Sequence, residues 1–65
     1  MQPDVMVENH GTVFLFAPLS DAAKEWVREN VVLEPYQWLG PAFSVEHRYA
    51  RDLAAGMQSD GLVVE

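Results

Sequence analysis

The chain has 65 residues, a mass of 7.3 kDa and no cysteine, which fits one domain, 1–65, without a disulfide framework or a thiolate metal cage. Ten Asp and Glu residues against four Lys and Arg give a net charge of −6, which disfavours direct binding to nucleic acid or to an anionic membrane. No apolar run approaches the ~20 residues of a membrane span, so we expect a soluble cytoplasmic protein.

Two strands are predicted at the start of the chain. Residues 4–8 are short and β-branched, and residues 12–17 form a stronger apolar run. The connection 9–11 ends in Gly11, which tolerates the positive φ of a hairpin loop. Pro18 has no N–H to donate and therefore ends the second strand.

A helix is predicted over 20–30. Ser20 is a good N-cap, and Asp21 in the first turn suits the positive end of the helix dipole. An apolar stripe identifies the face expected to be buried, and it consists of Ala22, Ala23, Trp26 and Val27. The segment 31–43 that follows contains Pro35, Gly40 and Pro41, so we expect an ordered loop that carries aromatic residues to the core.

A second helix is predicted over 44–59, with Ser44 as its N-cap. Apolar residues recur there every four positions, at Val45, Tyr49, Leu53 and Met57. Gly61 is the expected left-handed residue after the helix. Residues 61–64 then form a third strand.

These elements predict an α+β fold of ββααβ order, with two helices on one face of a three-stranded antiparallel sheet. The strand 12–17 is apolar on both faces, because Val13 and Leu15 alternate with Phe14 and Phe16. Two helices cover only one face of a small sheet. The second face is covered either by the segment 31–43, in which case we expect a monomer, or by a second copy of the chain.

No pattern of catalytic or metal-binding residues is found. His10 and His47, with neighbouring carboxylates, match no known ligand spacing. Ser44, His47 and Asp52 would point in different directions from one helix, so they do not form a triad. We therefore expect no enzyme activity, no metal and no cofactor.

The acidic residues of the first predicted helix form the candidate binding surface. Asp21, Glu25 and Glu29 lie at i, i+4 and i+8, which makes an anionic ridge with steps of ~6 Å. Glu34 follows the helix, and Trp38 is either a lid on the core or an exposed apolar anchor. The ridge is either a solvated face that keeps the domain soluble or a strip that imitates the phosphates of nucleic acid.

Three segments, 8–13, 22–26 and 45–49, together with the closing Asp60-Gly61-Leu62, resemble a group of short uncharacterised bacterial proteins found on phages, plasmids and integrative elements. Within that setting, the size and acidity are similar to those of anti-CRISPR proteins, which are small phage-encoded inhibitors of Cas proteins. The resemblance is one of class, and it implies a place in the cytoplasm of a bacterial host.

We therefore expect a non-enzymatic inhibitor that binds a protein with a basic nucleic-acid-binding surface, such as a Cas protein, and does not bind nucleic acid itself. The expected contacts are Asp21, Glu25, Glu29, Glu34 and Trp38. The alternative is a small regulator that binds a transcription factor, or a second copy of itself, through an apolar sheet face.

Overall fold

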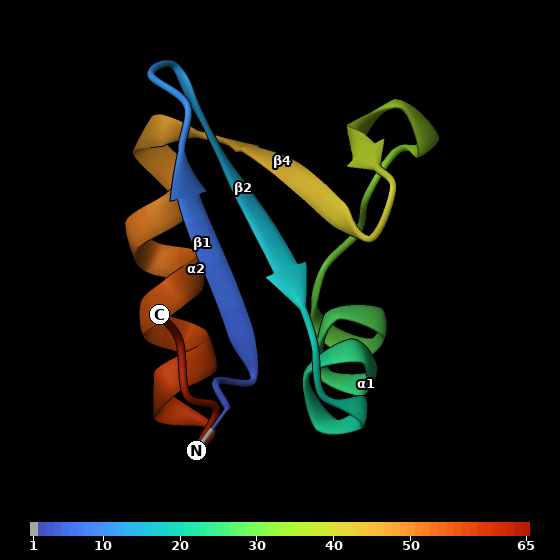
Figure 1. Cartoon of the computed structure of the whole chain (residues 1–65), viewed down its shortest axis with the longest axis vertical. Helices are drawn as coiled ribbons and strands as arrows, with labels where there is room; N and C mark the ends of the chain where they lie inside the picture. The colour runs from blue at the N-terminus through green and yellow to red at the C-terminus, as the bar shows by residue number, and fades with distance from the viewer. Residues whose placement is uncertain (1) are drawn as a thin grey trace.

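A computed structural model describes residues 2–65 and shows an α+β domain with two helices and a four-stranded antiparallel sheet (Figure 1). The prediction of an α+β fold is confirmed, but the predicted three-stranded sheet and ββααβ order are wrong. Spatially, the strand order is β1-β2-β4-β3. Along the chain the elements are β1 (Val5–Asn9), β2 (Val13–Pro18), α1 (Asp21–Asn30), the 3₁₀ turn η1 (Pro35–Gln37), β3 (Trp38–Leu39), β4 (Ala42–Glu46) and α2 (His47–Ser59).

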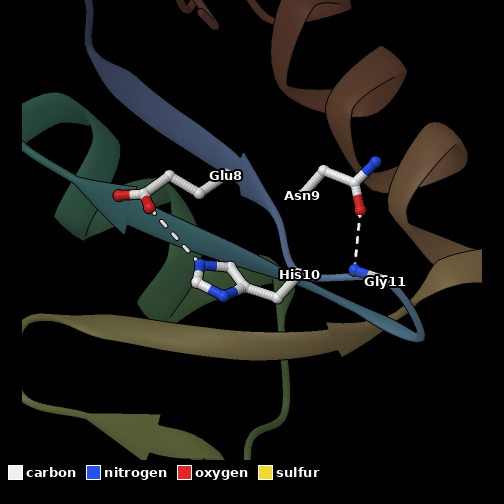
Figure 2. A network of polar contacts seen from close by, with 4 residues as sticks. All are labelled: Glu8, Asn9, His10 and Gly11. Atoms are coloured by element: carbon white, nitrogen blue, oxygen red, sulfur yellow. Dashed lines mark hydrogen bonds and ion pairs between the residues drawn. The ribbon is translucent and has the colours of Figure 1, made fainter.

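The predicted hairpin is present, formed by β1 and β2 with Val7 opposite Phe16. Figure 2 shows its turn, where the Asn9 side-chain oxygen accepts a hydrogen bond of 2.8 Å from the Gly11 N–H. Gly11 has a φ of +86°, a value that costs glycine little because it has no Cβ. An Asn two residues before a Gly therefore stabilises this turn.

Residues 42–46 form a strand, which corrects the predicted helix start at Ser44. This strand, β4, pairs with β2 on one side and with β3 on the other, and Ser44 lies opposite Leu15 instead of capping a helix. A two-residue turn with Gly40 at a φ of +65° joins β3 to β4. The segment predicted as a loop therefore supplies a second hairpin.

The helix α2 begins at His47, three residues later than predicted. Leu53 and Met57 of the predicted apolar stripe pack in the core, whereas Tyr49 does not. The four-residue recurrence would place Tyr49 in the core, but this residue is 54% exposed. The Arg48 guanidinium lies 5.1 Å from the centre of its ring. Ala50 and Met57 are the buried residues of the helix. Val45 does pack against the core, as predicted, but from a strand.

The end of α2 matches the prediction. Gly61 has a φ of +93° and its N–H donates to the carbonyl of Gln58 over 3.0 Å, while the Leu62 N–H donates to the carbonyl of Met57 over 3.0 Å. These two bonds satisfy carbonyls that the last helical turn leaves unpaired. Leu62 is buried as a result of this reversal.

The C-terminal segment lies along β1, but it is not the predicted antiparallel strand 61–64. It forms an isolated parallel bridge between Val5 and Val64, with backbone hydrogen bonds to Val5 and Val7. The segment is also held through Asp4, whose carboxylate accepts a hydrogen bond of 2.8 Å from the Val63 N–H. In Figure 1 the C-terminal end lies partway up the molecule, beside α2 and β1.

The core lies between the helices and one face of the sheet. Phe16 and Phe43 are fully buried and their rings stack with centroids 5.6 Å apart. Both helices contribute to the same cluster, whose buried residues are Val5, Phe16, Ala23, Val27, Phe43, Ala50, Met57 and Leu62. Among residues 2–65, no helix is long and apolar enough to cross a membrane.

Trp26 joins the two helices and is only partly buried, where the sequence predicted a core residue. Its indole N–H donates to an Asp60 carboxylate oxygen over 2.6 Å. Gly56 of α2 faces the same ring, and a Cβ built on Gly56 would lie 3.7 Å from the nearest indole carbon. That distance is an ordinary van der Waals contact, so the ring leaves room for a methyl group.

We therefore predict opposite effects for the same substitution at two glycines. Gly56→Ala should stabilise the domain by about 0.5–1 kcal/mol, because alanine has the higher helix propensity and its methyl group contacts Trp26. Gly61→Ala should destabilise it by about 1–2 kcal/mol, because an L-residue is strained at that positive φ. Urea denaturation of both variants measures the two values, and a loss of stability in Gly56→Ala would contradict the helix packing.

The Asp4 carboxylate should make stability depend on pH in the acid range. Hydrogen bonds from the Ser20 side chain and then from the Val63 N–H hold the pKa of Asp4 below its usual range. The lowered pKa means that this carboxylate stabilises the fold above about pH 4, the value in unfolded chains, and that the contribution disappears as the pH falls through the folded pKa. In urea titrations, the stability difference between the parent and Asp4→Asn should shrink below about pH 4. A difference that stays constant down to about pH 2 would contradict this role.

Candidate interaction surfaces

The three predicted acidic residues of α1 are all exposed. Ser20 caps the helix as predicted, since its hydroxyl accepts the Ala23 N–H over 3.0 Å, and the helix buries Ala23 and Val27. This orientation turns the anionic ridge of Asp21, Glu25 and Glu29 toward solvent. Within the ridge, Glu25 pairs with Arg28 over 3.2 Å.

Glu34 is exposed but belongs to another element. It precedes η1, where its N–H donates to the side-chain oxygen of Gln37 over 2.9 Å and its carbonyl accepts the Gln37 N–H over 3.0 Å. These bonds fix the backbone of the turn. Glu34 therefore adds a carboxylate beyond the end of α1 without extending the helical ridge.

Trp38 lies with basic residues and apart from the acidic ridge. Its ring meets the buried Phe43 edge-on at 5.3 Å between centroids, and 40% of the residue stays exposed. It therefore both covers the core and offers an exposed surface, the two roles that the sequence left open. The groove it lines is also lined by Lys24 and Arg28, and by none of the ridge carboxylates.

The second face of the sheet, called here the outer face, is not covered by the segment 31–43. Residues of that segment instead extend the sheet edgewise as β3 or pack on the core, as Leu33 does. The outer face is apolar at its centre and has exposed carboxylates beside it. By register it contains Met6, Glu8, Val13, Leu15, Ala17, Leu39, Ala42, Ser44 and Glu46.

The histidines do not assemble with carboxylates into a metal site. The imidazole of His10 lies 3.3 Å from the Glu8 carboxylate at the exposed hairpin turn (Figure 2). His47 instead lies beside Phe14, with ring centroids 5.5 Å apart. Across residues 2–65, no three His, Asp or Glu side chains come together in a way that would hold a metal ion.

Comparison of the chain with protein-family models, with curated proteins and with solved structures gives no match. The structure of the chain itself is therefore the basis for describing these candidate surfaces. Sequence patterns located the acidic ridge and the apolar outer face. They missed the groove beside α1, because its walls come from elements that only tertiary packing brings together.

Proposed function

We propose that the protein is a non-enzymatic interaction protein that binds a partner with a basic nucleic-acid-binding surface, in the manner of a small acidic inhibitor such as an anti-CRISPR protein. The observation that supports this proposal is the exposure of Asp21, Glu25 and Glu29 along one side of α1. Complementary charge accelerates encounter and fixes orientation more than it raises affinity. An exposed acidic helix on a chain of net charge −6 suits a basic groove that otherwise holds phosphates.

The like charges of the ridge destabilise α1, which favours a binding function for the ridge. Like charges four residues apart on a helix destabilise it by a few tenths of a kcal/mol per pair. The Glu25–Arg28 ion pair offsets part of this repulsion, but Asp21 and Glu29 have no ion-pair partner among residues 2–65. A basic partner would supply the missing opposite charges.

The outer face supports a second candidate function, a small regulator that binds through apolar contacts. Met6 is 42% exposed there and Leu15 is partly exposed, and apolar surface left open on a sheet is typical of a binding site. Glu8 and Glu46 lie on the same face. Each of these carboxylates has a partner within the chain, His10 for Glu8 and Arg48 for Glu46, so the face suits either a different protein or a second copy.

Charge reversal on α1 tests the first function. The double variant Glu25→Lys/Glu29→Lys should stay folded, because exposed substitutions usually change stability by about 0.5 kcal/mol or less. Proteins captured from a bacterial lysate by the immobilised parent should be lost from the variant, since a basic groove would then meet like charge. Capture by the parent should also weaken steeply with added salt and be competed by double-stranded DNA.

The matched control is Asp52→Lys/Glu65→Lys, which changes the net charge by the same amount at two exposed positions outside the ridge. This control should retain the captured proteins, so a loss with both variants would indicate non-specific charge attraction. A third variant, Leu15→Lys, changes only the outer face. If Leu15→Lys abolishes capture while the ridge reversal does not, the second function replaces the first.

A further inference from the structure

A groove of about 380 Å³ lies between α1 and the β3 edge of the sheet. Pro18 and Val27 contribute to it from β2 and α1, and Val31 and Leu33 contribute from the segment that leaves the helix. Trp38 forms an aromatic wall. This volume and this mostly apolar lining are typical of sites for small organic molecules, which measure roughly 300–1,000 Å³.

The groove also concentrates positive charge. Lys24 and Arg28, two of the four Lys and Arg residues of the chain, line it. Lys24 forms no ion pair within residues 2–65, and Arg28 uses one guanidinium nitrogen for Glu25 at 3.2 Å. A guanidinium has five N–H donors, so the contact with Glu25 leaves most of them for a ligand.

We propose that this groove binds a small amphiphilic carboxylate, with its aliphatic or aromatic body against Leu33 and Trp38 and its carboxylate between Lys24 and Arg28. The apolar walls provide burial for the body, and the cations can donate charge-assisted hydrogen bonds to the anionic end. One anionic group fits best, because Glu25 already neutralises part of the Arg28 charge. The site is chemically opposite to the acidic ridge and does not depend on the function proposed for it.

The probe for this site is octanoate, followed in ¹H–¹⁵N correlation spectra of the full chain. The Trp38 indole signal, assigned with Trp38→Phe, and the amide signals of Val31 and Leu33 should shift saturably. The Trp26 indole, bonded to Asp60, should stay in place. Octanol has the same apolar chain without the charge. It should bind about tenfold more weakly, which is the discrimination expected from two exposed charge contacts.

Substitutions of the basic residues then test where the carboxylate of octanoate binds. Lys24→Gln/Arg28→Gln should reduce octanoate affinity to that of octanol. The matched control Arg48→Gln/Arg51→Gln removes two positive charges from α2 and should leave octanoate affinity unchanged. The control also examines a second cavity, of about 250 Å³, which Arg51 lines together with Phe14 and Ala54.

Three results would overturn the proposal: no saturable shift at Trp38, equal affinities for octanoate and octanol, or shifts centred on Phe14 and Ala54 that disappear in the Arg48→Gln/Arg51→Gln variant. The comparison of the two probes uses the parent chain alone. It is therefore decisive even if a variant is poorly folded.

Discussion

The contact between Phe16 and Phe43 is the interaction on which the rest of the structure depends. The two residues lie opposite each other on β2 and β4, fully buried and with nearly parallel rings. Because side chains alternate along a strand, this single pairing decides which residues of both strands face the helices, and a slip by one position would turn Leu15 or Ser44 inward. Trp38 is positioned by the same Phe43 ring, so the groove beside α1 also follows from this pairing.

A chain of 65 residues has enough helix to cover only one face of its sheet. Small domains bury a smaller fraction of their surface than large ones, and here the uncovered face contains Leu15 and Met6. The molecule consequently presents surfaces of three different chemistries within a small volume: the anionic ridge of α1, the apolar outer face, and the groove with two cations. The ridge and the groove adjoin each other, because Glu25 of the ridge pairs with Arg28 of the groove.

Several turns and helix ends can be predicted from the sequence because their signals are local. The Asn9–Gly11 turn, the Ser20 cap and the Gly61 reversal each depend on residues a few positions apart, and all three appear in the structure. Residues 42–46 could not be assigned in this way, since Val45 fits the spacing of a helix and also the alternation of a strand. Pairing with β2, which is distant in sequence, decides between the two. The exposure of the α1 carboxylates followed from helical spacing, whereas the position of Trp38 beside Lys24 and Arg28 required the fold.

The C-terminal segment along β1 determines how this sheet can meet other proteins. Its backbone forms hydrogen bonds with both Val5 and Val7, so much of the outer edge of β1 is already occupied. At the opposite edge, β3 has only two residues and is followed by Pro41 within the turn. Short or covered edges do not serve as templates for an additional strand. The domain is thereby protected against edge-to-edge pairing along β1 and β3.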